Sequence, residues 1–204
     1  MKTKTLLLTG FVPFLNFTIN PTEQIANELD QQTIGNYKVH SSILPVDFNQ
    51  SAAQLLHHIN DIKPDAVISL GLAAGRAHIT PERIAINCKD AGGAPDNNGV
   101  IHQDEPIDQS GPAAYFSTLP IRDMVNHLTE NQYPAKVSNT AGTYLCNNVM
   151  YAALHYLMNN QTNIPAGFIH IPASHELAVQ LANTPSWSQQ DLTNAIKLSI
   201  ETLN

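Results

Sequence analysis

Cys146 lies where a loop of small residues, 138–143, gives way to an amphipathic helical pattern. The N-terminus of a helix carries about half a positive charge and free N–H groups, which favour a thiolate over a thiol. The same N–H groups could hold an oxyanion during acyl transfer. A lone cysteine is more often a small hydrophobic residue of the core. The position therefore leaves two interpretations open, a nucleophile and a packing residue.

His170 could serve as the base for this thiol. It lies in the apolar segment 168–172, FIHIP, where a buried imidazole needs hydrogen-bond partners for both nitrogens. One nitrogen could face Cys146 and the other a carboxylate, which is the arrangement that activates a cysteine nucleophile. The alternative is a core histidine that bonds to the backbone.

A carboxylate would have to orient this imidazole and balance its charge. Glu82 is the favoured candidate, because it introduces a segment dense in Ile and Ala where an unpaired carboxylate would be unfavourable. Asp96 and Asp47 are the alternatives. Glu82 could also form only a surface ion pair with Arg83 or Arg76.

The motif GFVPF, residues 10–14, places Phe11 and Phe14 in one short loop. Two phenylalanines at a strand end either cover the core or line a small apolar pocket. Asn20 and the backbone around Leu72 could then bind a small planar amide. The nearby segment GLAAGR lacks both the GxxxxGK[ST] and the GxGxxG patterns, so nucleotide binding has little support.

Apolar runs rich in Val, Ile and Leu alternate with helical patterns along the chain. Strands are expected at residues 5–10, 37–44, 66–71, 83–87, 135–139 and 167–171. Helices are expected at residues 22–29, 48–59, 121–129, 147–158, 174–181 and 188–203. This alternation is typical of a layered α/β fold with a mostly parallel sheet. No repeat or linker divides the chain, so residues 1–204 are expected to form a single domain.

The candidate residues follow the carboxyl ends of the expected strands, where open α/β sheets bind their ligands. Residues 10–14 follow the first strand, residues 71–76 follow the third, and His170 lies at the end of the last. Cys146 follows the strand expected to end at residue 139. The polar stretch 89–111 is predicted to be a long functional loop.

Composition excludes several classes of function. The net charge of −7 argues against nucleic acid and anionic membranes as partners. No apolar run approaches the roughly 20 residues of a membrane span, and the run of three leucines near the start is too short for a signal peptide. Two cysteines without metal-ligand spacing predict free thiols in the cytoplasm and no metal site.

Several motifs in order along the chain carry a family resemblance. They are LLTGFVPF, INPTE, ISLGLAAGR, ITPERIAIN, PDNNG, SNTAGTYLCNNVMYAALHYL and FIHIPASHE. In these motifs the sequence resembles pyroglutamyl peptidase type I, the pyrrolidone-carboxylate peptidase family of cysteine peptidases. The resemblance implies a single three-layer α/β/α sandwich with a twisted, mostly parallel central sheet. It also implies a homotetramer and a reaction without a metal or organic cofactor.

The resemblance further implies removal of an N-terminal pyroglutamyl (5-oxoproline) residue from peptides. Its catalytic triad corresponds to Glu82, Cys146 and His170, the residues that the chemistry of the sequence also favours. The lactam ring would lie between aromatic side chains and bond to the backbone. The residues implied in substrate binding are Phe11, Phe14, Asn20, Leu72, Tyr144 and Leu145.

Three departures from the family pattern leave room for other functions. Val12 stands in place of a glutamate, LAAGR replaces a QAGGR-like segment, and Gly92-Gly93-Ala94 replaces a basic residue in the loop before PDN. One alternative is a catalytically impaired member that acts as a binding or oligomeric module. The other is a nucleoside phosphorylase-like enzyme on a similar sandwich, although ten Lys and Arg residues without a Gly–Lys loop offer few phosphate ligands.

Overall fold

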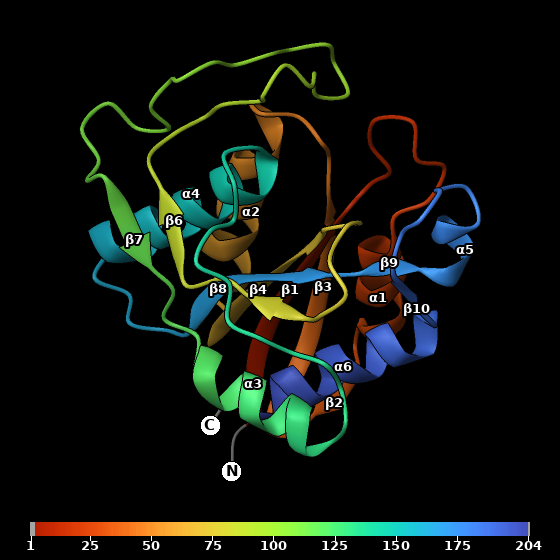
Figure 1. Cartoon of the computed structure of the whole chain (residues 1–204). Helices are drawn as coiled ribbons and strands as arrows, with labels where there is room; N and C mark the ends of the chain where they lie inside the picture. The colour runs from red at the N-terminus through yellow and green to blue at the C-terminus, as the bar shows by residue number, and fades with distance from the viewer. Residues whose placement is uncertain (1–2, 204) are drawn as a thin grey trace.

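The computed structural model describes residues 3–203 and contains a six-stranded central sheet between two layers of helices (Figure 1). The strands lie in the order β2-β3-β1-β4-β8-β5. β1, β3, β4 and β8 run parallel, whereas β2 and β5 pair antiparallel at the two edges. The expected α/β class with a mostly parallel sheet is therefore confirmed.

The elements have the following bounds. The strands are β1 Lys4–Phe11, β2 Thr33–Ile34, β3 Tyr37–Leu44, β4 Ala66–Leu72, β5 Thr80–Pro81, β6 Ile84–Ile86, β7 Ala114–Phe116, β8 Ala166–Ile171, β9 Ala173–Ser174 and β10 Ser186–Trp187. The helices are α1 Pro21–Leu29, α2 Gln50–Ile62, α3 Ile121–Glu130, α4 Leu145–Asn159, α5 His175–Ala178 and α6 Gln189–Glu201.

Two apolar cores lie on the two faces of the sheet. On one face, alternate residues of β1 such as Leu6 and Leu8 pack against α1, α3 and α6. On the other face, Leu7 packs against α2 and α4. Alternation of side chains along a strand explains why successive leucines of LLL serve opposite layers. The central strands β4 and β8 are buried at every position, as expected for strands covered by helices on both faces.

Two of the predicted strands differ in the structure. Residues 135–139 form no strand but only two isolated bridges, one to Ile79 and one to Glu82. Pro81 lies between these bridges and has no N–H to donate, so the parallel ladder loses a bond there. Residues 83–87 contribute β6, but β6 pairs with β7 in a separate two-stranded sheet rather than joining the central one.

Three of the predicted helices begin or end elsewhere. The helix expected at 174–181 is only the single turn α5. The helix expected from residue 48 begins at Gln50, because the Asp47 side chain accepts hydrogen bonds from the backbone N–H groups of Asn49 and Gln50. α4 begins two residues earlier than expected, so that Cys146 lies in its first turn.

α1 begins close against the end of β1, and this approach requires a glycine. A Cβ atom on Gly10 would lie 2.4 Å from the carbonyl oxygen of Thr22 in the first turn of α1. Asn20 caps the same turn, since its side chain accepts a hydrogen bond from the Thr22 N–H. The loop between Phe11 and Asn20 is thereby held at the carboxyl end of the sheet.

We predict that Gly10→Ala destabilises the fold by about 1–3 kcal/mol, because the methyl group overlaps backbone atoms that cannot move independently. Gly75→Ala is the matched control, since a Cβ atom at Gly75 meets nothing within 4 Å. Urea unfolding of both variants measures the difference. Equal midpoints for the two variants would contradict this view of the β1–α1 contact.

Candidate active site

Cys146 lies in the first turn of α4, beside the carboxyl ends of β4 and β8. The chain reaches it through Tyr144, which precedes the helix in an extended conformation. The thiol is half-buried and free. A Cβ atom on Gly71 of β4 would lie 3.0 Å from Cys146 Sγ and 2.5 Å from the Phe168 ring. Gly71 therefore provides the space in which the sulfur lies, a role that sequence reasoning missed.

His170 comes from β8, where it is the register partner of Gly71. Its side chain is buried, and Nδ1 donates a hydrogen bond of 2.7 Å to Glu82 Oε1. Burial alone would lower the pKa of His170. The charge and hydrogen bonding of Cys146, together with those of Glu82, outweigh burial and raise it from 6.5 to about 9. The structure thus brings the three predicted residues together around one imidazole.

Glu82 is fully buried, which rules out the alternative of a purely surface ion pair. Its Oε1 also accepts a hydrogen bond of 2.6 Å from Arg76 Nη1. Burial works against the charged form, but the hydrogen bond and charge of His170 lower the pKa of Glu82, and Arg76 contributes in the same direction. Glu82 is therefore a carboxylate at neutral pH.

The two alternative carboxylates have structural roles instead. Asp96 accepts hydrogen bonds from the backbone N–H groups of Phe48, Asn98 and Val100. Asp47 binds the first turn of α2 and the side chain of Asn98. Both aspartates fasten the long loop 89–111 to the body of the domain, and neither bonds to His170.

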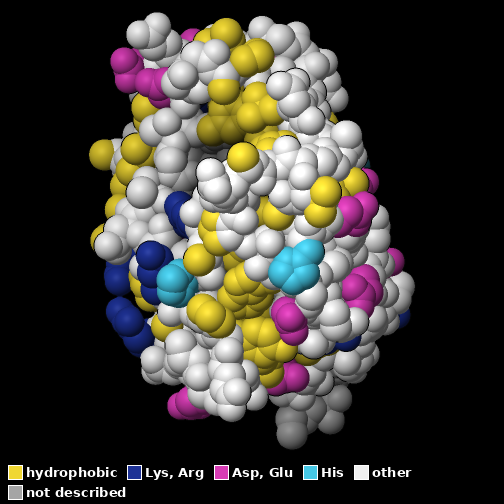
Figure 2. Space-filling model, turned by 45° about the vertical axis from the view of Figure 1, so that its right-hand side comes forward, with side chains coloured by type: hydrophobic (Ala, Val, Ile, Leu, Met, Phe, Trp, Pro, Cys, Tyr) yellow, Lys and Arg dark blue, Asp and Glu magenta, His cyan; other side chains and the backbone are white. Residues whose placement is uncertain are grey.

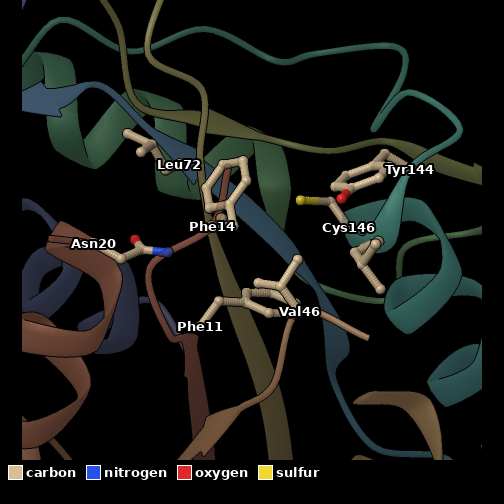
Figure 3. A pocket seen from close by; sticks show the side chains of 9 residues that line it. Phe11, Phe14, Asn20, Val46, Leu72, Tyr144 and Cys146 are labelled. Carbon is tan, nitrogen blue, oxygen red and sulfur yellow. The ribbon is translucent and has the colours of Figure 1, made fainter. Parts of the chain in front are cut away.

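A small apolar pocket opens beside the Cys146 sulfur (Figure 3). It encloses about 270 Å³, part of which is open to solvent. Its lining consists of Phe11, Phe14, Asn20, Val46, Gly71, Leu72, Tyr144, Leu145 and Cys146. All six predicted binding residues are in this set, to which the structure adds Val46 and Gly71. No charged side chain lines the pocket, so it suits a small uncharged group.

The predicted binding residues contribute in different ways. Figure 3 shows the Cys146 sulfur pointing towards the Phe14 ring. Asn20 lines the pocket, but its amide is already engaged: Oδ1 accepts from Thr22, and Nδ2 donates to the Val12 carbonyl. Asn20 therefore shapes the loop rather than offering a fully free amide. Leu145 is almost fully buried and supports the pocket mainly from the core.

The loop 89–111 fastens three walls of this pocket to one another. The Tyr144 hydroxyl donates a 2.8 Å hydrogen bond to the Pro95 carbonyl. Asn97 donates from its backbone to the Val46 carbonyl and from its side chain to the Pro13 carbonyl. Figure 1 shows this segment arching over α2 and α4. The length of the loop indicated a functional role, but its contacts could not be read from the sequence.

Among the described residues no three His, Cys, Asp or Glu side chains converge in a way that could hold a metal ion. In residues 3–203 there is also no helix with the length and apolar character needed to cross a membrane. Figure 2 shows apolar side chains gathered in a hollow on one face of the molecule.

A thiol in the first turn of a helix, beside a buried imidazole that bonds to a carboxylate, is the arrangement by which cysteine hydrolases activate a nucleophile. The pyroglutamyl peptidase family model matches residues 4–204. The chain belongs to the pyroglutamyl peptidase family.

Relatives and solved structures of this family match almost the whole length of the chain. A pyrrolidone-carboxylate peptidase of Halalkalibacterium halodurans is 53% identical over 199 residues, which cover 97% of this chain and 98% of the relative. One from Lysinibacillus sphaericus is 57% identical over 196 residues, 96% of this chain and 95% of the relative. The pyroglutamyl peptidase I structure from Bacillus amyloliquefaciens has a TM-score of 0.95 at 40% identity, covering 98% of this chain and 94% of that one. The nucleoside phosphorylase alternative is thereby set aside.

We predict that Tyr144→Phe weakens substrate binding about three- to tenfold, because it removes one hydrogen bond between a pocket wall and the loop while it keeps the ring. KM should rise more than kcat falls, since the bond is remote from the reacting sulfur. Steady-state kinetics with a pyroglutamyl amide measures both. Tyr133→Phe, a change outside the pocket, serves as the control, and an unchanged KM in Tyr144→Phe would refute the role of this bond.

Proposed function

We propose that this chain is a pyroglutamyl peptidase I that removes an N-terminal pyroglutamyl residue from peptides through a Glu82–His170–Cys146 triad. One observation carries the assignment of residues: Cys146 lines an uncharged, partly aromatic pocket and lies beside the imidazole of the His170–Glu82 pair. A pyroglutamyl residue fits this pocket chemically, because its lactam ring is planar and has no ionisable amine.

The proposed reaction begins with an ion pair. The Cys146 thiolate attacks the pyroglutamyl carbonyl carbon, and electrons move onto the carbonyl oxygen. Backbone N–H groups at the start of α4, including that of Cys146, stabilise this oxyanion, with a typical worth of about 3 kcal/mol per donor. His170 then gives its proton to the leaving amine as the C–N bond breaks. An acyl-enzyme remains, joined through a thioester.

In the second half of the proposed reaction, His170 takes a proton from water, which attacks the thioester. The thiolate leaves, and free pyroglutamate is released. Glu82 holds the imidazole through its 2.7 Å bond to Nδ1 and stabilises the cationic form throughout. No cofactor takes part in these steps.

Binding of the lactam is proposed to use shape and the backbone rather than charge. Phe11 and Phe14 would lie against one side of the ring and Tyr144 against the other. Groups of the backbone near Leu72 would bond to the lactam N–H and C=O. The neutral lining of the pocket supports this arrangement, since an ionised amine at the same position would lose its hydration without gaining a partner.

We also propose that the protein is a cytoplasmic homotetramer whose partners are peptides with an N-terminal pyroglutamate, rather than nucleic acid or membranes. Large apolar side chains exposed at Phe116, Met158 and Ile101 support an assembly that covers them. Two free cysteines, one of them the nucleophile, suit a reducing compartment. Native mass spectrometry measures the number of subunits.

The decisive experiment measures release of a fluorescent amine from an L-pyroglutamyl amide, with an L-prolyl amide as the substrate control. We expect turnover of the pyroglutamyl amide only, and a loss of about a thousandfold or more in Cys146→Ala. Cys88→Ala is the matched control, because Cys88 is also a free thiol but does not line the pocket. Absence of turnover in the folded wild-type protein would favour the impaired, binding-module alternative.

The pH dependence of kcat should report the protonation of His170. Its folded-state pKa of about 9 lies above the ordinary 6.5, so the imidazolium is retained through neutral pH and is lost as the pH rises through about 9. Because the leaving amine takes its proton from His170, we expect kcat for amide hydrolysis to fall above about pH 9. The part of the folding stability that comes from the charged imidazole is fully present below about pH 6.5 and is lost progressively as the pH rises from there to about 9. A pH profile of kcat that still rises at pH 10 would contradict the assignment.

A further inference from the structure

The guanidinium of Arg76 bonds to the segment that carries Glu82 and to the loop before Cys146, and it reaches the backbone of His170 through the Thr80 hydroxyl. We propose that Arg76 is a positioning residue of this site, which holds Glu82 in the orientation that His170 requires. The inference rests on the proposed function of the triad, and adds to it a residue that does not line the substrate pocket.

Arg76 and His170 bind the same oxygen of Glu82. Arg76 Nη1 lies 2.6 Å from Oε1, and His170 Nδ1 lies 2.7 Å from it. The other oxygen, Oε2, is buried and has no hydrogen-bond partner in the structure. The carboxylate therefore depends on one oxygen for both of its ionic contacts, and the second donor restricts rotation that would carry Oε1 away from the imidazole.

The balance of charge around Glu82 also requires the positive charge of Arg76. When the thiolate and imidazolium are both formed, Cys146 and His170 cancel, and Glu82 remains as a fully buried negative charge. Arg76 supplies the balancing positive charge while about a third of its own side chain, 31%, stays exposed to solvent. A buried carboxylate without such a partner takes up a proton at higher pH, and it then no longer stabilises the cationic imidazole.

Two further bonds link Arg76 to the surroundings of His170 and Cys146, one through the Thr80 side chain and one to the Thr140 backbone. Nη1 also donates to the Thr80 hydroxyl at 2.7 Å, and that hydroxyl donates to the carbonyl of His170 itself at 3.3 Å. Nη2 lies 3.4 Å from the carbonyl of Thr140, in the loop that leads into Cys146. The planar guanidinium offers several donors in fixed directions, which a lysine ammonium on one flexible stem does not.

The experiment compares Arg76→Gln, Arg76→Lys and Arg83→Gln. Arg83 is the matched control, because it lies next to Glu82 in sequence and carries the same charge, but its Nε binds Asn139 at 2.7 Å. We expect Arg76→Gln to lower kcat roughly 10- to 100-fold with little change in KM, by analogy with other residues that orient a catalytic group. Arg76→Lys should recover part of the loss, and Arg83→Gln should match the wild type.

A pH profile separates positioning from a merely structural contribution. The titratable and charged groups that face Glu82 are His170 from β8 and Arg76 itself, with Cys146 of α4 beyond the imidazole. Loss of the Arg76 charge raises the pKa of Glu82, so the acid limb of kcat should move to higher pH in Arg76→Gln. The limb should stay in place in Arg76→Lys and Arg83→Gln. An equal loss at every pH would overturn the proposal.

A double-mutant comparison covers the case in which Arg76→Gln fails to fold. In Glu82→Gln the carboxylate charge is absent. Adding Arg76→Gln to this variant therefore leaves no buried unpaired charge, and we expect the double variant to be less than about threefold less active than Glu82→Gln alone. A further tenfold loss would show that Arg76 acts independently of Glu82, and would overturn the proposal.

Alkylation of Cys146 by iodoacetamide, followed by peptide mass spectrometry, gives a readout that needs no peptidase substrate. We expect the rate at pH 6 to fall severalfold in Arg76→Gln relative to Arg83→Gln, since Glu82 is then held less firmly and stabilises the imidazolium beside the sulfur less well. Equal alkylation rates in Arg76→Gln and Arg83→Gln would contradict the positioning role of Arg76, even if the wild type hydrolyses pyroglutamyl amides. A wild type that lacks turnover but shows this difference would instead refute the proposed function alone.

Discussion

The hydrogen bond between His170 and the buried carboxylate of Glu82 is the contact on which the rest of the site depends. Glu82 has no exposed surface, so its charge is tolerable only if cationic partners stay in place. One of these partners is an imidazole on a central strand, and the other is a guanidinium at the rim. The layers of apolar side chains on both faces of the sheet fix this geometry, because they leave β8 no freedom to shift.

The sequence predicted most of the fold and the residues that meet at the site, for identifiable reasons. Periodic apolar patterns revealed the central strands and the long helices, and a helix start could be placed within two residues of Cys146. The segment around Glu82 was harder. Its neighbours 135–139 have the composition of a strand, but Pro81 interrupts the pairing. β7 was missed because its partner β6 lies nearly thirty residues earlier, across an irregular loop.

Contacts that depend on the course of a loop could not be predicted. Nothing in PDNNG indicates that Asn97 reaches the carbonyls of Val46 and Pro13, because these partners lie far away in the chain. The space that Gly71 leaves for the sulfur follows from strand register, which composition does not specify. Arg76 was recognised from sequence only as a surface ion-pair partner, although its carboxylate partner proves to be fully buried.

The order in which the chain contributes to the site has a consequence for biosynthesis. The carboxylate comes from residue 82, the thiol from residue 146, and the imidazole from β8, which is the last strand to enter the central sheet. A nascent chain therefore carries Cys146 out of the ribosome before His170, the base that we propose for it. On the proposed roles, we expect the Cys146 thiol to gain its activating base only when β8 joins the sheet, so that the unfinished chain exposes a thiol without that base.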